Sequence, residues 1–122
     1  MPAVRAADLA SEPFLMSSAG REAAIKAFFA ASGMATRVVA TVVRGMPTPL
    51  AMAREGVGVT IVPALVLCPT PLSACWTVPL DPARLRRLVV VRRADHASLP
   101  LATAFLKAVR SAAESPIDAA AP

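Results

Sequence analysis

The sequence predicts an α/β fold in which short apolar strands alternate with amphipathic helices. The prediction rests on three observations. Apolar runs rich in β-branched residues recur along the chain, segments with helical periodicity lie between them, and glycine or proline stands at most of the boundaries. Strands that alternate with helices pair in parallel through right-handed crossovers, so we expect a three-layer sandwich with helices on both faces of one sheet.

The chain is organised around residues 53–63, where a helix is expected to end on glycine and lead directly into a strand. Gly56 can adopt the left-handed conformation that closes a helix at little steric cost. The run 57–62 is rich in β-branched residues and is bounded by Pro63. Because both of its faces are nearly apolar, it is predicted as a central parallel strand covered on two sides.

Two strands and a helix are expected before that centre. The strands are placed at residues 12–16 and 37–43, after a lead segment (residues 1–10) with one helical turn at 6–10. The helix is placed at residues 21–32, because one of its faces would carry Ile25, Phe28, Phe29 and Ser32. A serine of the preceding loop, Ser17 or Ser18, can cap its first turn, and Gly33 ends it.

Another helix is predicted at residues 49–55, with Thr48 as N-cap and Pro49 at the first helical position. Beyond Pro63 we expect a short helix at 63–67, an edge strand at 76–80 and a last strand at 88–91. A final helix begins at Pro100, and its apolar stripe comprises Leu101, Phe105, Ala108, Val109 and Ala112. Residues 11–114 would form the domain, followed by a disordered tail at 115–122.

The composition is that of one globular domain that has more apolar residues than its own core is expected to bury. The chain has 122 residues, of which 56% are hydrophobic and 17% charged, and this excludes global disorder. Part of so apolar a surface is expected to be covered by a partner. The net charge is +5, but the arginines are scattered and the chain lacks tyrosine, so we expect no nucleic-acid-binding surface.

The sequence shows no targeting or membrane segment. The N-terminus lacks the basic start and apolar core of a secretory signal, which predicts a cytoplasmic protein. Residues 56–80 carry no charge, but prolines cut them into pieces too short to span a membrane. Cys68 and Cys75 lack the spacing of a zinc site. A disulfide between them is possible in principle, but the pattern favours reduced thiols in a reducing cytosol.

Few residues could carry catalysis. His96 is the only histidine, and no serine or cysteine nucleophile pattern accompanies it. The acidic residues are dispersed, and the common phosphate-binding and metalloprotease motifs are absent from the sequence. We therefore expect a protein that is not an enzyme and that uses no cofactor or metal.

The best candidate for a ligand site is the loop Ser17-Ser18-Ala19-Gly20. It follows a strand and leads into a helix, and ligands of open α/β sheets bind beyond the carboxyl ends of the strands. The free N–H groups of the helix start favour an anion, and two hydroxyls with a glycine suit a carboxylate. The alternative, that the serines only cap the helix, stays open. Residues 43–47, with Val62 and Pro63, end the neighbouring strands and should border the same cleft.

Several segments stand in a characteristic order and spacing. They are Asp8-Leu9-Ala10-Ser11-Glu12-Pro13-Phe14, residues 33–42, Met52-Ala53-Arg54-Glu55-Gly56-Val57-Gly58-Val59-Thr60-Ile61-Val62-Pro63, Val78-Pro79-Leu80, Arg87-Leu88-Val89-Val90-Val91-Arg92-Arg93 and Ala104-Phe105-Leu106. Together they resemble the C-terminal effector-binding region of LysR-type transcriptional regulators, and the resemblance extends from about Asp8 to Arg110.

The resemblance implies a fold like that of the type 2 periplasmic binding proteins, with two α/β subdomains around a cleft. It also implies a helix-turn-helix DNA-binding domain at the far N-terminus, which this chain lacks. The chain matches the second subdomain and the strand and helix that return to the first, so we expect a half-cleft, as a natural or cut fragment. Residues 17–20 correspond to the family's effector-contacting turn. The implied function is the sensing of a small, commonly acidic effector.

The family pairs subdomains of neighbouring subunits side by side, which implies a homo-oligomer. By that resemblance the interface is expected on the helix 21–32 and the strand 37–43, through Ile25, Phe28 or Phe29 if these are not wholly core. One alternative is a fragment of a transporter's solute-binding protein, which shares the fold, although the missing secretory signal argues against it. The other is a free-standing half-domain that binds a ligand or another protein.

Overall fold

The computed structural model describes residues 2–18, 20–67, 74–96 and 99–114. The chain divides into two compact units, residues 1–84 and residues 85–122, which we call unit 1 and unit 2 and describe separately. The lead segment belongs to unit 1, because Ala6 is buried in its core. The tail expected at residues 115–122 lies outside the described residues.

Unit 1 is built on two parallel strands, β1 (Pro13–Ser17) and β2 (Arg37–Val42). Both strands were predicted, and so was their parallel pairing. Phe14 lies opposite Val38, and Ser17 lies opposite Val42. The register shifts between Phe14 and Leu15, so that β2 contains one residue more than the stretch of β1 beside it. The last residues of the two strands therefore meet at the same end of the sheet.

Residues 57–62 lie along the other edge of β1, but they do not form the central strand that the sequence predicts. Their ladder is a single bridge between Phe14 and Val59, in which Val59 N donates to Pro13 O at 2.8 Å and Leu15 N to Val59 O at 2.8 Å. Thr60 Oγ1 adds a bond to Leu15 O at 3.0 Å. The central strand is therefore β1, with β2 on one edge and Val59 on the other. Residues 58–62 are only half-buried, because they stand at the edge of the described sheet.

The core lies between β1 and helix α2 (Glu22–Ala30). As predicted, Ile25, Phe28 and Phe29 share the buried face of this helix, and each is at most 4% exposed. Phe29 makes edge-to-face contacts with both Phe14 and Phe28, with ring centroids 5.5 Å apart in each pair. This aromatic cluster fixes α2 against the strand that leads into the candidate site.

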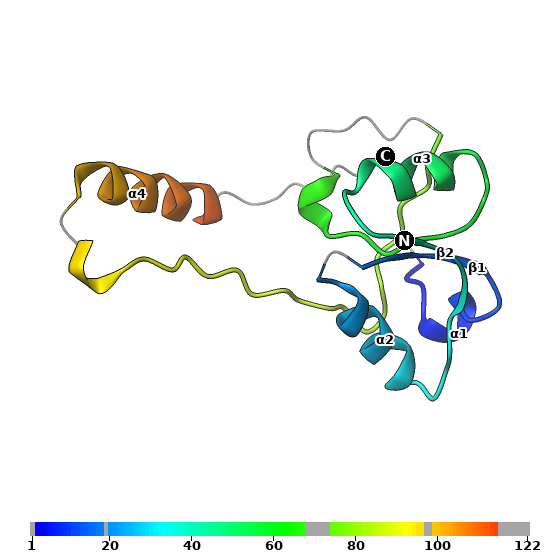
Figure 1. Ribbon diagram of the computed structural model, residues 1–122. Helices are drawn as coiled ribbons and strands as arrows, with labels where there is room; N and C mark the ends of the chain where they lie inside the picture. The colour runs from blue at the N-terminus through cyan, green and yellow to red at the C-terminus, as the bar shows by residue number, and fades with distance from the viewer. Residues whose placement is uncertain (1, 19, 68–73, 97–98, 115–122) are drawn as a thin grey trace. The chain divides into compact units, whose positions relative to one another are not determined.

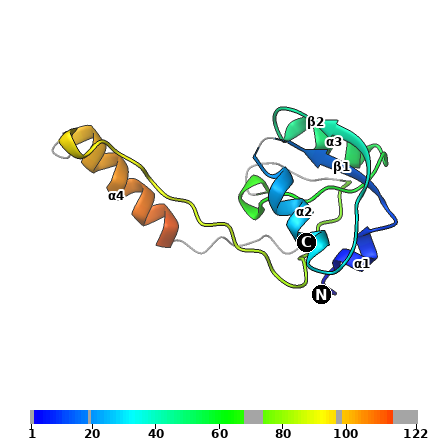
Figure 2. The same cartoon turned by 60° about the horizontal axis from the view of Figure 1, so that its bottom comes forward.

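Helices lie on both sides of the two strands (Figures 1 and 2). Helix α1 (Ala6–Leu9) lies with α2 on one side, and α3 (Pro47–Arg54) lies on the other. Leu15 points to the α3 side, because side chains alternate along a strand, and it is fully buried. The arrangement is mixed α/β, as expected, with two paired strands in the described part of the chain.

Glycines end both long helices of unit 1, as the sequence predicts. After α3, Gly56 has a φ of +75°, its N–H donates to Ala53 O at 3.0 Å, and Val57 N donates to Met52 O at 3.0 Å. These two bonds satisfy carbonyl groups of the last turn and turn the chain towards β1. Gly33 closes α2 in the same way.

The start of α3 differs from the prediction. The helix begins at Pro47 with Met46 as N-cap, not at Pro49 with Thr48 as cap. Both prolines fit the first turn of a helix, where their missing N–H is not needed, so the earlier one could also begin it. Pro49 is fully buried inside the first turn.

The two ends of unit 1 are joined by a short parallel bridge between Val4 and Leu80. Val4 N donates to Pro79 O at 2.9 Å, and Asp81 N donates to Val4 O at 2.9 Å. The predicted edge strand at residues 76–80 is reduced to this bridge. The short helix expected at residues 63–67 is present as the 3₁₀ helix η1 (Ala64–Val66).

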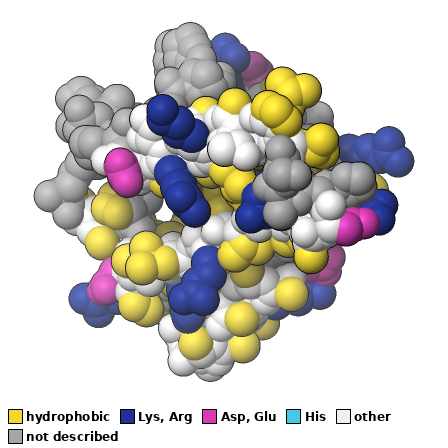
Figure 3. All heavy atoms as spheres, turned by 90° about the vertical axis from the view of Figure 1, so that its left-hand side faces the viewer, with side chains coloured by type: hydrophobic (Ala, Val, Ile, Leu, Met, Phe, Trp, Pro, Cys, Tyr) yellow, Lys and Arg dark blue, Asp and Glu magenta, His cyan; other side chains and the backbone are white. Residues whose placement is uncertain are grey.

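Unit 2 contains the 3₁₀ helix η2 (Ala94–His96) and helix α4 (Pro100–Glu114). The strand predicted at residues 88–91 does not form. These residues have no strand partner among the described residues, and Leu88, Val89 and Val91 are between 66% and 86% exposed. Uncovered hydrophobic side chains are visible on the surface in Figure 3. A strand that is apolar on both faces needs neighbours on both edges, and unit 2 supplies none among its described residues.

Helix α4 begins at Pro100 as predicted, but its expected apolar stripe is not buried. Leu101 is 86% exposed and Phe105 is 60% exposed. The half-buried positions are instead Ala102, Leu106 and Val109. No residue of α4 is buried. Within the part of the chain that the structure describes, no helix is long and apolar enough to cross a membrane.

Candidate functional site

The predicted ligand loop leaves the carboxyl end of β1 and enters α2. Ser18 N donates to Val42 O at 3.0 Å, which ties the loop to the last residue of β2. Gly20 N donates to Ser18 O at 2.7 Å, and Gly20 has a φ of +75°, a conformation that favours glycine. Ala19 lies outside the described residues. The loop is therefore a tight turn at the edge of the sheet where both strands end.

The serines do not cap α2. Its N-cap residue is Arg21, and no side chain caps the helix start. Ser17 is fully buried, and its Oγ accepts a hydrogen bond from Arg21 Nη2 at 2.8 Å. Ser18 Oγ donates to Val42 O at 3.4 Å. The alternative in which the serines serve only as helix caps is therefore wrong, because both hydroxyls have other partners.

The other predicted site residues end at the same edge of the sheet. The segment 57–62 runs parallel to β1 with Val59 opposite Phe14, so Val62 and Pro63 follow at the end where Ser17 lies. Both residues are half-buried. Val43, just beyond β2, is 70% exposed. The pairing of Ser17 with Val42 thus brings two of the three chain ends together, and the third run is joined to β1 at Val59 and Thr60.

Arg21, which the sequence analysis did not single out, contacts the predicted loop. Its Nε is buried and has no hydrogen-bond partner, while its Nη2 contacts Ser17. An unsatisfied buried donor typically costs about 1–3 kcal/mol, and more when the group is charged. The signal was in the sequence, since an arginine follows directly on the Ser-Ser-Ala-Gly loop, but only the fold shows that its side chain turns back to β1.

Two hollows among the described residues are lined by none of the predicted site residues. One, of about 270 Å³, is lined by Lys26, Phe29, Met34, Ala35 and Thr36 below the end of α2. The other, of about 310 Å³, belongs to unit 2 and is lined by Arg92, Thr103, Leu106, Lys107 and Arg110.

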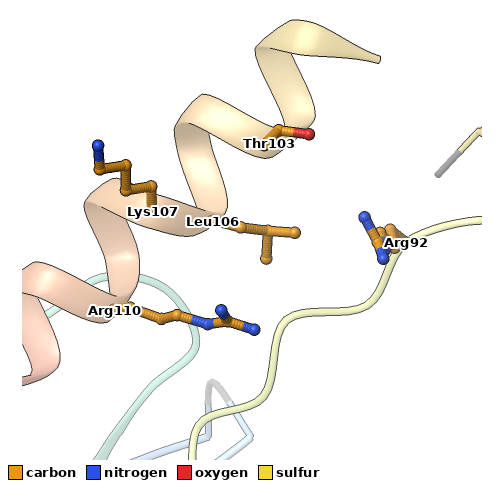
Figure 4. Close-up of a pocket in the computed structure, with 5 residues that line it drawn as sticks. All are labelled: Arg92, Thr103, Leu106, Lys107 and Arg110. Atoms are coloured by element: carbon orange, nitrogen blue, oxygen red, sulfur yellow. The ribbon is translucent and has the colours of Figure 1, made fainter. Parts of the chain in front are cut away.

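The hollow of unit 2 is cationic and open. Figure 4 shows that Leu106 and Arg110 project from α4 towards Arg92, whereas Lys107 is directed away from them. The lining holds no carboxylate. None of the side chains that line it is buried, so solvent screens these charges, and an anion there would be held weakly.

The sequence offers two cysteines and one histidine for redox, metal or acid–base chemistry. Cys75 is a free, half-buried thiol, and Cys68 lies outside the described residues. His96 ends η2 in unit 2. In the described ranges, no group of histidine, cysteine and acidic side chains is arranged to hold a metal ion.

Comparison with protein families gives one match, which covers almost the whole chain. The model of the family described as "LysR substrate binding domain" matches residues 2–114. Comparison with curated proteins finds no match. Comparison with solved structures finds none either.

Proposed function

The chain belongs to the LysR substrate binding domain family, and from this membership we propose that it is the effector-sensing part of a LysR-type transcription regulator. The family supplies transcription regulators with effector-binding domains of the type 2 periplasmic-binding-protein-like fold. It belongs to regulators and not to enzymes. The match does not favour the transporter alternative. We propose the cytoplasm as the place of action, since a regulator of this kind meets its DNA there.

The proposed effector site is the edge of unit 1 formed by Ser17, Ser18, Gly20, Val62 and Pro63. Its support is that β1 and β2 end side by side at the loop that opens α2, and that residues 57–62 run parallel to β1. Ligands of α/β sheets bind at such carboxyl ends, and the uncapped N–H groups of α2 favour an anionic group there. Ala19, the remaining residue of the predicted loop, lies outside the described residues.

We propose that this edge is one wall of a cleft whose other wall is a second α/β subdomain. The support comes from unit 2. Its run at residues 88–91 is apolar on both faces yet exposed, and the stripe of α4 that carries Leu101 and Phe105 is uncovered. Surfaces of this kind are stable in water only against another apolar layer. Effector binding between the two walls would favour a closed state and so shift the regulator's conformational equilibrium.

The structure leaves only part of the oligomer interface that was expected from the sequence. Ile25, Phe28 and Phe29 are wholly core, so they cannot form the interface considered in the sequence analysis. Strand β2, the other part of that interface, keeps an unpaired edge among the described residues. Val38 and Val39 on it are 42% and 46% exposed. We therefore propose that the chain associates with a second copy through β2. The chain itself is not proposed to read DNA.

Titration of the ¹⁵N-labelled chain with a panel of small organic acids, followed by NMR, tests the effector site. We expect the backbone amides of Ser17, Ser18, Gly20 and Val62 to shift together and saturably with at least one acid. Ser18→Ala removes one hydroxyl from the loop and should weaken the response without unfolding unit 1. Responses confined to the cationic hollow around Arg110 would contradict the assignment.

A further inference from the structure

Residues 85–93 of unit 2, which we call the unpaired segment, expose every one of their side chains. The segment contains no helix, strand or turn, and it runs as a drawn-out chain ahead of η2 (Figure 1). Its middle holds four consecutive apolar residues, Leu88-Val89-Val90-Val91, and even the least exposed of them, Val90, is 46% exposed. Because β-branched residues favour extended backbone, the segment suits the role of a strand, but it has no strand partner among the described residues.

Arginine pairs flank this apolar middle, with Arg86-Arg87 before it and Arg92-Arg93 after it. No acidic residue occurs from residue 82 to residue 94. Arg93 forms an ion pair with Asp95, whereas neither Arg86 nor Arg87 takes part in the ion pairs found in the described ranges. The unpaired segment is therefore apolar in its middle and positively charged at its ends, most strongly at the end that holds Arg86 and Arg87.

This pattern restricts the kind of partner that fits the segment. Pairing of two copies through it would place arginines beside arginines at both ends, and like charges opposite each other on neighbouring strands are destabilising. A nucleic acid would attract the arginines through its phosphates but would leave the four apolar side chains in water. The fitting partner offers apolar surface and negative charge together, in a groove that accepts an extended chain.

We propose that the unpaired segment is a docking site for a peptide-binding chaperone whose groove is apolar in its middle and acidic at its rims. The groove covers residues 88–91 and forms backbone hydrogen bonds with them, as in the addition of a strand. Carboxylates at the rim face Arg86 and Arg87. The inference goes beyond the proposed function. The same run is the proposed contact with a second subdomain, so the chaperone binds the chain while that subdomain is not in place.

A role of the arginines in solubility alone makes a different prediction. Charged residues beside an apolar run also protect it from aggregation, and in that case their replacement changes solubility but not the affinity for a chaperone. The double variant Arg86→Gln with Arg87→Gln tests the charges, and Arg54→Gln is its control, since Arg54 is exposed in the last turn of α3. Val89→Asp tests the apolar middle. Its matched control is Leu101→Asp, because both side chains are largely exposed, at 73% and 86%.

The test measures binding of the complete 122-residue chain to a purified chaperone of the seventy-kilodalton heat-shock class with bound ADP, by isothermal titration calorimetry. We expect saturable binding that Val89→Asp weakens more than tenfold, because a charge would enter the apolar groove. The double arginine variant should weaken it about tenfold, and this difference should vanish at about 1 M salt. The two controls should bind like the unsubstituted chain.

Hydrogen exchange read by mass spectrometry locates the contact, and we expect the chaperone to protect the amides of residues 87–92. Absence of binding, equal affinity of Val89→Asp, or protection confined to other residues would overturn the proposal. Equal affinity of the double arginine variant would overturn the acidic rim. If Val89→Asp instead abolished self-association of the chain without chaperone, the segment would belong to a contact between copies. Circular dichroism of each variant shows whether its helices are retained.

Discussion

Gly58→Ala is expected to destabilise unit 1 by about 2–4 kcal/mol. A Cβ atom at this position would lie 3.1 Å from the Pro13 carbonyl carbon and 3.3 Å from Pro13 Cβ, and closer still to the carbonyl oxygen. That oxygen accepts the Val59 N–H at 2.8 Å, so the segment cannot move away without losing the bond. Overpacking costs about 1–3 kcal/mol and a lost hydrogen bond about 1 kcal/mol, which together give the range.

Urea unfolding followed by far-ultraviolet circular dichroism measures this change. Trp76 is 92% exposed, so its fluorescence would respond little to unfolding. Gly56→Ala is the matched control: its Cβ would meet nothing within 4 Å, and only the φ of +75° opposes the substitution, at about 1 kcal/mol. An unfolding midpoint for Gly58→Ala equal to that of the unsubstituted chain would refute the view that this close approach holds residues 57–62 to β1.

Other perturbations test the core, the proposed contact and unit 2. Phe29→Ala should cost about 3–5 kcal/mol in urea unfolding, because the ring is 1% exposed, whereas Phe105→Ala, at 60% exposed, should change the midpoint little. Val39→Lys should lower self-association in sedimentation velocity without loss of stability; unchanged association would exclude β2 as the contact. Limited trypsin digestion, read by mass spectrometry, should cut within residues 85–114 before unit 1, and the reverse order would contradict the exposure of unit 2.

Features decided by neighbouring residues were predictable from the sequence. Gly33 and Gly56 end helices because only the local backbone conformation matters there. Ile25, Phe28 and Phe29 share a face because the helical period places residues three or four positions apart on the same side. Their burial could be predicted because all three side chains are apolar. The predicted N-cap of α3 was wrong for an equally local reason. Two prolines compete for the first turn, and nothing in the pattern ranks them.

Features decided by distant partners were not predictable. Residues 57–62 and 88–91 are both apolar and β-branched. The first run is joined to β1 by a single bridge, and neither run forms a full strand among the described residues. A strand exists only when another strand pairs with it, and the sequence pattern does not name that partner. The contact of Arg21 with Ser17 was not predictable for the same reason, since it depends on how α2 folds back on the end of β1.

The bridge between Val4 and Leu80 has a mechanical consequence. The first and last segments of unit 1 lie side by side and are joined by backbone hydrogen bonds and by the Arg5–Asp81 ion pair. Val4 bonds to both Pro79 and Asp81, so fraying of either segment breaks the bonds of the other. The two ends of unit 1 should therefore open together as one cooperative unit and not separately.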